Sequence, residues 1–298
     1  MQIEYREEPC RSALNRVVGM GFEWSLNPYM GCAHRCAFCY VRQFERRAER
    51  PSGETYGLSI RVKTNIAQVL RTELARPSWK REQVAIGAAT DPYQPIEGQY
   101  RLTRACLIEL SRARTPFGII TRGPLIVRDL DVLTEAAKRV KVGVSISIPT
   151  LDEAVCRTLE PGAPPPRARL EAVRRLVDAG IRAGIGMAPI LPGLSDAPEQ
   201  LAAVVRAARE VGAVSLWAGV VYLKDAPREH FLDALRREWP EQLAYYEKLF
   251  ASRSYLPRRL TAPIVEKVRE LKLLHDIADR RTLRLEPAPE PGQLLLGV

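Results

Sequence analysis

The sequence is poor in asparagine and has no long apolar segment. Only Asn15, Asn27 and Asn65 occur among its 298 residues, whereas proline occurs 23 times. Few thermolabile amides beside many prolines and arginines favour a thermophilic source. No apolar run is long enough to span a membrane, and no basic leader with an apolar stretch and a cleavage site opens the chain. We therefore expect a cytoplasmic protein without a membrane partner.

A disulfide framework is not expected either. The chain has six cysteines, and without a secretory signal they are predicted to be free thiols or metal ligands. Hydrophobic residues make up 46% of the chain and charged residues 27%, which is ordinary for a globular protein. A length of 298 residues allows one barrel-sized domain or two smaller ones.

The charge balance is basic. The 45 lysines and arginines exceed the 35 acidic residues and give a net charge of +10. Such an excess favours polyanionic partners such as DNA or RNA. A genomic preference for arginine, or a generally charged surface, is the alternative explanation, because the arginines are spread along the chain and form no basic tail.

Three of the cysteines, Cys32, Cys36 and Cys39, follow one another in the spacing Cys-x3-Cys-x2-Cys. Thiolates are the soft ligands that iron–sulfur clusters need, and so short a loop can present three of them to one cubane cluster. One iron is then left without a protein ligand, and an exogenous chelating molecule can bind there. Two alternatives are a zinc site with His34 as fourth ligand and a chance grouping of buried cysteines.

This loop resembles the defining motif of the radical S-adenosylmethionine (SAM) superfamily, Cys-x3-Cys-x-aromatic-Cys, in which Phe38 supplies the aromatic residue. The resemblance implies a [4Fe-4S] cluster whose open iron is chelated by the amino and carboxylate groups of SAM. It also implies reductive cleavage of SAM to methionine and a 5′-deoxyadenosyl radical that abstracts a hydrogen atom. The expected partner is an electron donor such as a flavodoxin or ferredoxin.

Beyond the cysteine loop, short apolar runs alternate with amphipathic helical stretches. This alternation predicts an α/β fold with a parallel sheet, and by itself it allows a barrel or a doubly wound sheet. The number of strands matches the partial TIM barrel of six β/α units in the radical SAM superfamily. The strands are expected at residues 22–26, 84–89, 117–121, 140–148, 181–189 and 214–221.

Three regions are predicted along the chain. Residues 1–21 form an N-terminal extension without clear periodicity, and residues 22–222 form the partial barrel. Residues 223–298 form a helical C-terminal extension with a flexible tail around residues 287–291. Three tyrosines of this extension serve either helix packing or the stacking of nucleic-acid bases. They are Tyr245, Tyr246 and Tyr255.

Ligands of parallel β/α folds bind at the carboxyl ends of the strands, so residues there are candidates for SAM binding. Thr90 and Asp91 are expected to accept hydrogen bonds from the SAM amino group. Arg122 suits the SAM carboxylate, because a guanidinium pairs with a carboxylate in a planar fork. Ser147 is expected to bond to the ribose or carboxylate, and the backbone of Tyr40 to meet the adenine. Each is alternatively an ordinary turn, loop or strand residue.

Further motifs narrow the resemblance to the spore photoproduct lyase-like branch of the superfamily. They lie at Ser25–Cys32, Thr90–Pro95, Leu159–Pro161 and Ala188–Leu194. The similarity extends over nearly the whole chain, from about Arg11 to Asp276. The branch's named member repairs a thymine dimer in spore DNA, and one of its cysteines returns a hydrogen atom. At the position of that cysteine this sequence has Ala88 and Ala89.

The sequence therefore does not identify the residue that returns the hydrogen atom. Cys106, Cys156 and Tyr93 are the remaining candidates, although both cysteines are equally explained as small buried residues.

We predict a radical SAM enzyme that abstracts hydrogen from a DNA base or lesion. One alternative is a radical SAM enzyme that acts on a nucleotide, peptide or small metabolite. Another is a non-catalytic iron–sulfur or zinc protein that binds nucleic acid.

Overall fold

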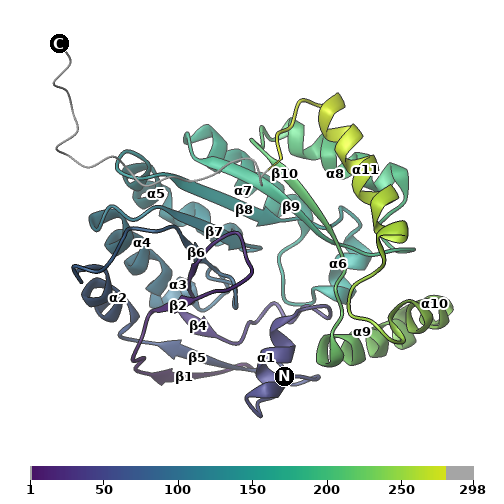
Figure 1. Ribbon diagram of the computed structural model, residues 1–298, viewed down its shortest axis with the longest axis horizontal. Helices are drawn as coiled ribbons and strands as arrows, with labels where there is room; N and C mark the ends of the chain where they lie inside the picture. Colours follow the sequence, from purple (N-terminus) through teal and green to yellow (C-terminus); the bar gives the residue numbers. More distant parts are fainter. Residues whose placement is uncertain (1, 280–298) are drawn as a thin grey trace.

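In the computed structural model, which describes residues 2–279, the chain winds into a seven-stranded sheet with helices along its outer side (Figure 1). Six of the strands are parallel, and their order across the sheet follows their order in the chain. They are β3 (Trp24–Leu26), β6 (Val84–Ile86), β7 (Phe117–Thr121), β8 (Val142–Ser147), β9 (Arg182–Ile190) and β10 (Leu216–Val220). The predicted partial barrel is confirmed.

The N-terminal segment contributes a strand to each of two sheets. β2 (Leu14–Arg16) pairs antiparallel with β3 at the edge of the main sheet. β1 (Glu4–Glu8) pairs with β5 (Ser59–Lys63), which also pairs with β4 (Tyr29–Met30) in a small second sheet. The sequence predicted only an extension here. Four of the five residues of β1 are exposed, so no alternation of apolar and polar residues marks it as a strand.

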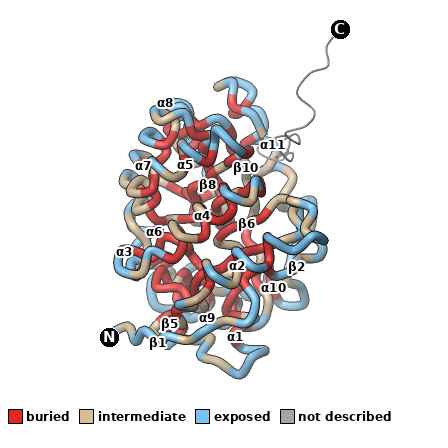
Figure 2. Tube along the Cα trace, turned by 90° about the vertical axis from the view of Figure 1, so that its left-hand side faces the viewer, coloured by how far each residue is buried: buried red, intermediate tan, exposed pale blue. Residues whose placement is uncertain are grey.

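Amphipathic helices follow the strands, as the alternation predicts. α5 and α7 pack on β8, and α7 and α8 pack on β9. Apolar side chains between sheet and helices form the main core, which Figure 2 shows as buried chain inside exposed outer helix faces. The helices around it are α2 (Ile66–Leu74), α4 (Leu102–Arg112), α5 (Leu130–Ala137), α7 (Pro166–Asp178) and α8 (Pro198–Glu210). Shorter helical segments in the connections are α3 (Glu97–Tyr100), a 3₁₀ turn (Pro124–Asp129) and α6 (Glu153–Leu159).

The C-terminal helices lie in two places. α9 (Asp225–Glu238) and α10 (Pro240–Phe250) pack on each other, and α9 also packs on α1 (Val41–Arg47). α11 (Arg258–Leu274) instead returns to the barrel and packs on α8 and β10. The predicted flexible tail around residues 287–291 lies outside the described residues. No helix between residues 2 and 279 combines the length and the apolar composition needed to cross a membrane.

A second apolar core joins α9 and α10 to the cysteine loop. Phe231, Tyr246 and Phe250 are completely buried in it. Phe38 and Leu159 belong to the same core, so the loop rests on packed side chains on its outer side. Burial of these apolar groups stabilises the loop in one position relative to the barrel.

Candidate active site

The cysteine loop connects β4 to α1 and is held by backbone and side-chain hydrogen bonds. The amide of Arg35 donates to the carbonyl of Cys32 and that of Cys39 to the carbonyl of Cys36, both over 3.2 Å. Cys32 and Cys36 are buried, and Cys39 is partly buried. Burial raises the pKa of Cys32 and raises that of Cys36 to about 12. Metal binding to such thiols therefore has to release protons.

A neighbouring segment, residues 159–162, clamps this loop. The amide of Ala37 donates to the carbonyl of Leu159 over 2.8 Å, and the amide of Gly162 donates to the carbonyl of His34 over 3.1 Å. The approach is so close that a Cβ on Gly162 would lie 2.0 Å from the carbonyl oxygen of Ala33. The Leu-Glu-Pro motif noted in the sequence therefore belongs to the wall of the cysteine loop.

Asp91 ties three parts of the chain together. Its Oδ1 accepts hydrogen bonds from the amide of Tyr93 (2.9 Å) and from Thr121 Oγ1 (2.5 Å). Its Oδ2 accepts from the amide of Arg122 (2.7 Å) and lies 3.2 Å from His34 Nδ1. Burial by itself would raise the pKa of Asp91, but His34 and the hydrogen bonds lower it to about 2. The carboxylate is thus held charged.

These contacts give Asp91 and Thr90 partners within the chain, and their predicted hydrogen bonds to the SAM amino group stay a prediction. Both oxygens of Asp91 are engaged by protein donors. Thr90 Oγ1 donates to the carbonyl of Gly31 over 2.6 Å and accepts from Gln94 Nε2 over 3.1 Å. Both residues therefore position the cysteine loop against the ends of β6 and β7.

Arg122 belongs to a buried ionic network. Its Nε donates to Glu160 Oε1 over 2.6 Å, and Arg169 Nη2 lies 2.6 Å from Glu160 Oε2. The Arg122 guanidinium lies over the ring of Phe38, 5.8 Å from its centroid. Within residues 2–279 its two terminal nitrogens form no hydrogen bond, which leaves a planar pair of donors facing the cavity.

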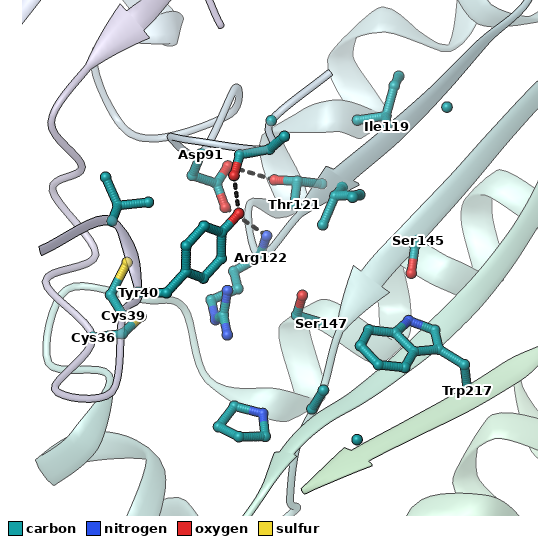
Figure 3. A pocket seen from close by; sticks show the side chains of 18 of the residues that line it. Cys36, Cys39, Tyr40, Asp91, Ile119, Thr121, Arg122, Ser145, Ser147 and Trp217 are labelled. Atoms are coloured by element: carbon teal, nitrogen blue, oxygen red, sulfur yellow. Dashed lines mark hydrogen bonds between the residues drawn. The ribbon is translucent and has the colours of Figure 1, made fainter. Parts of the chain in front are cut away.

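A cavity of about 1020 Å³ extends from the cysteine loop into the barrel (Figure 3). Space exists there because Gly118, Gly143 and Gly219 line it, whereas closed TIM barrels fill their interior with branched side chains. Pockets for drug-sized ligands are about 300–1,000 Å³, so the cavity can hold a second molecule beside a cofactor. The predicted cofactor and cluster residues all line it. They are Cys32, Cys36, Phe38, Cys39, Tyr40, Thr90, Asp91, Arg122 and Ser147.

The three candidates for hydrogen return do not reach this cavity. Cys106 lies on α4 in the main core, and Cys156 Sγ on α6 donates to the carbonyl of Thr150 over 3.7 Å. The Tyr93 hydroxyl donates to Asp129 Oδ2 over 3.2 Å. Tyr40 does line the cavity, and its hydroxyl donates to the carbonyl of Ala88, so its ring spans from the cysteine loop to the end of β6.

The sequence analysis did not predict the contacts of several residues at the site. It treated His34 only as a possible zinc ligand, and it assigned no role to Glu160 and Gln94, which occur within two of the quoted motifs. Ser145 and Trp217 were assigned no role from the sequence, yet both line the cavity. The motif positions of Glu160 and Gln94 were the available signal, whereas their partners are distant in sequence and could not be identified from it.

The donor set and the surrounding charge fit an iron–sulfur cluster. Arg42 is 1% exposed, and its guanidinium donates to the carbonyls of Arg35, Cys36, Ser52 and Gly53. It has no ion pair among the described residues. Burial lowers the pKa of Arg42, and the Cys39 and Cys36 side chains oppose this shift. An anionic thiolate cluster would supply the negative charge that this buried cation lacks.

The three thiols are not arranged around one point. Between residues 2 and 279, no three His, Cys, Asp or Glu side chains converge closely enough to hold a single metal ion. In a cubane, each thiolate binds a different iron.

The sequence is similar to a known protein family and to several proteins of other organisms. The model of the radical SAM superfamily matches residues 26–205. An uncharacterized protein of Mycobacterium tuberculosis is 36% identical over 277 residues, which are 90% of this chain and 82% of that protein. An uncharacterized protein of Acidianus two-tailed virus is 31% identical over 219 residues, 70% of each chain.

Solved structures of spore photoproduct lyase have the same fold. The enzyme complexed with dinucleoside spore photoproduct gives a TM-score of 0.68 at 15% identity, and the match covers 91% of this chain and 79% of that one. A mutant of the enzyme with bound AdoMet and the same dinucleoside gives equal values. At this identity the likeness concerns the fold alone.

Proposed function

Because the chain belongs to the radical SAM superfamily, we propose that it is a radical SAM enzyme acting on a base or lesion in DNA. Membership implies a [4Fe-4S] cluster, SAM and a reductant. When bound, the reduced cluster and SAM supply a 5′-deoxyadenosyl radical that abstracts a hydrogen atom from the substrate. We propose a flavodoxin or ferredoxin as the electron donor.

The roles of the residues follow from their contacts. We propose that Cys32, Cys36 and Cys39 hold the cluster, since they share one loop at the mouth of the cavity. Arg122 would bind the SAM carboxylate with its terminal nitrogens while Glu160 holds its Nε. Phe38 would pack beneath that guanidinium. Asp91 and residues 159–162 hold the loop against the barrel through their hydrogen bonds.

Ser147 and Tyr40 complete the proposed SAM pocket. Ser147 lines the cavity at the end of β8, where its hydroxyl can bond to the ribose or carboxylate. Tyr40 follows the last cysteine and lines the cavity, and its backbone would meet the adenine. The Tyr40 side chain is 38% exposed and forms part of the cavity wall.

The observation that favours nucleic acid is an aromatic pair at the rim of the cavity. Tyr222 lines the cavity, and its ring centroid lies 4.3 Å from that of Tyr255, which is 73% exposed. Burial raises the pKa of Tyr222, and the positive charge of Arg47 opposes this rise. Exposed aromatic rings beside cations are the features on which unpaired bases stack. Tyr246, in contrast, is fully buried between helices and serves packing.

Photoproduct repair with hydrogen return from a cysteine is less well supported. The resemblance places that cysteine where Ala88 lines the cavity. Among the described residues, the only cysteines that line the cavity are the three of the loop. We therefore propose a nucleic-acid substrate whose reaction does not depend on a cysteine at this position.

The experiment is an anaerobic assay of 5′-deoxyadenosine release with reconstituted protein, dithionite and SAM. We expect release to be stimulated by DNA oligonucleotides and not by free nucleosides. Cys39→Ala should abolish release, whereas Cys10→Ala, on the N-terminal segment, should retain it. Stimulation by nucleosides, peptides or metabolites instead of DNA would favour the alternative substrates. A reducible cluster that yields no 5′-deoxyadenosine would point to a non-catalytic protein.

A further inference from the structure

Two buried polar atoms inside the barrel have no hydrogen-bond partner among residues 2–279. They are Ser145 Oγ on β8 and Trp217 Nε1 on β10. Ser145 is only 3% exposed, and both side chains line the cavity. Figure 3 shows them on neighbouring parts of the sheet, turned into the same space. Buried donors are almost always paired in folded proteins, so two orphans facing one cavity indicate a partner from outside the chain.

The two atoms approach a common point. β9 runs between β8 and β10, and its Gly186 lies beside both side chains. A Cβ built on Gly186 would lie 3.1 Å from Trp217 Nε1 and 3.4 Å from Ser145 Oγ. Because Gly186 has no side chain, no Cβ stands between the two buried donors and the cavity that both side chains line.

This point lies deeper than the proposed SAM site. Ser147, at the carboxyl end of β8, is near the cysteine loop side of the cavity. Ser145 is the preceding inward-facing residue, about 7 Å farther from that end at the usual rise of a strand. A ligand at Ser145 and Trp217 would thus lie next to SAM and not in its place.

We propose that Ser145 Oγ and Trp217 Nε1 form a substrate-binding subsite that receives a planar heterocycle through a ring carbonyl oxygen. A carbonyl oxygen has two lone pairs and can accept from both donors at once. The indole offers a flat apolar surface, and the glycine-lined wall leaves room for a ring. Nucleobases such as thymine have this chemistry. The subsite rests on the proposed function, because it specifies how that cavity selects a base.

The variants are Ser145→Ala, which removes one donor and keeps the shape, and Trp217→Phe, which removes the other donor together with part of the indole surface. We expect each to weaken binding of the base about tenfold, the usual effect of losing one hydrogen bond. SAM binding and iron content should stay unchanged. Because Ser145 Oγ has no partner in the described part of the chain, Ser145→Ala should not lower the melting temperature of the ligand-free protein. Ser111→Ala, a buried serine on α4, is the control.

The probes are a dye-labelled oligothymidylate, free thymidine, and the same oligonucleotide with one central difluorotoluene nucleotide, which keeps the thymine shape without its carbonyls. Binding is measured anaerobically with the reconstituted holoenzyme and SAM. We expect wild-type protein to prefer thymine over difluorotoluene about a hundredfold, because the analogue loses both hydrogen bonds. Each variant should keep a preference of only about tenfold, through the donor that remains.

The outcomes separate the two proposals. If the oligonucleotide binds but neither variant changes its affinity or its preference, the subsite is wrong and the proposed function stands. If only free thymidine binds, and the variants weaken it, the subsite is correct and DNA is the wrong source of the base. If no probe binds to the wild-type protein, the proposal of a subsite for a base is overturned.

Discussion

At the scale of single residues, the site is organised by buried charges with several partners each. Asp91 accepts hydrogen bonds from its own turn, from Thr121 at the end of β7 and from the amide of Arg122, and it lies next to His34 of the cysteine loop. Glu160 in turn lies between Arg122 and Arg169 and is 2% exposed. Removing one member of such a network leaves another buried charge uncompensated. A side chain in such a network can be replaced at lower cost when its buried partner is also paired with a second residue of opposite charge.

Arg122 meets this condition, because Glu160 keeps Arg169 when Arg122 is replaced. Arg122→Ala should weaken SAM binding about tenfold to a hundredfold, since hydrogen bonds to charged groups contribute about 1.5–3 kcal/mol. Iron content should stay unchanged. Equilibrium binding of SAM to the reconstituted protein, with iron analysis of the same samples, measures both. Arg174→Ala, at an exposed position on α7, is the control. Unchanged SAM affinity would remove Arg122 from the proposed pocket.

At the scale of elements, the cysteine loop depends on segments that pack around it. Residues 159–162 form hydrogen bonds with the backbone of the cysteine loop. The helix after the loop, α1, is packed against α9. α11 begins at Arg258 and has Pro263 in its interior, where proline normally destabilises a helix. Packing of α11 on α8 and β10 stabilises the turn before that proline.

Gly162→Ala tests the clamp on the cysteine loop. The added methyl group would meet the backbone carbonyl of Ala33 at 2.0 Å, and backbone cannot move aside as a side chain can. We expect a loss of about 1–3 kcal/mol in unfolding free energy and a lower iron content after reconstitution. Gly53→Ala is the matched control, because a Cβ there meets nothing within 4 Å. Equal iron loading of the two variants would contradict the clamp.

His230 on α9 predicts a pH dependence of stability. Burial, followed by repulsion from Arg42 and Arg237, lowers its pKa to about 4. The unfolded chain, with an ordinary histidine pKa of about 6.5, therefore binds more protons between these values. Stability should fall as the pH drops from about 6.5 towards 4, by about 1–2 kcal/mol for a partly exposed group.

His230→Gln should remove most of this pH dependence, because the glutamine cannot take up a proton. Urea denaturation at pH 7 and pH 5 measures the effect. The difference in unfolding free energy between the two pH values should be smaller in the variant than in the wild-type protein. An equal difference in both proteins would show that other groups cause it.

At the scale of the whole molecule, the net charge of +10 and the aromatic rim make salt the most direct test of nucleic-acid binding. Each phosphate contact to a single strand contributes a slope of about −0.7 to the logarithmic dependence of affinity on salt. About four contacts would lower the affinity roughly fifty-fold between 50 and 200 mM salt.

Arg47→Ala should reduce the magnitude of this salt slope by about 0.7, because Arg47 lies close to Tyr222 at the rim. Titration of a labelled oligothymidylate at several salt concentrations gives the slope of each protein. Arg175→Ala, on α7, is expected to leave the slope unchanged. A salt-independent affinity of the wild-type protein would argue against phosphate contacts.

The sequence by itself determined the parts of this protein that depend on local pattern. The spacing of Cys32, Cys36 and Cys39 indicated the cluster, and alternating apolar runs indicated six β/α units. The positions of Arg122 and Ser147 at strand ends also predicted that they lie together, because parallel strands bring their carboxyl ends to one edge, and both line the cavity.

Only the tertiary structure decided which side chains meet. It brought His34 to Asp91 and Glu160 to Arg122, and it set Ser145 and Trp217 around Gly186. Local periodicity specifies the face on which a side chain lies. Strand register and loop packing, which join residues far apart in the chain, determine its partner.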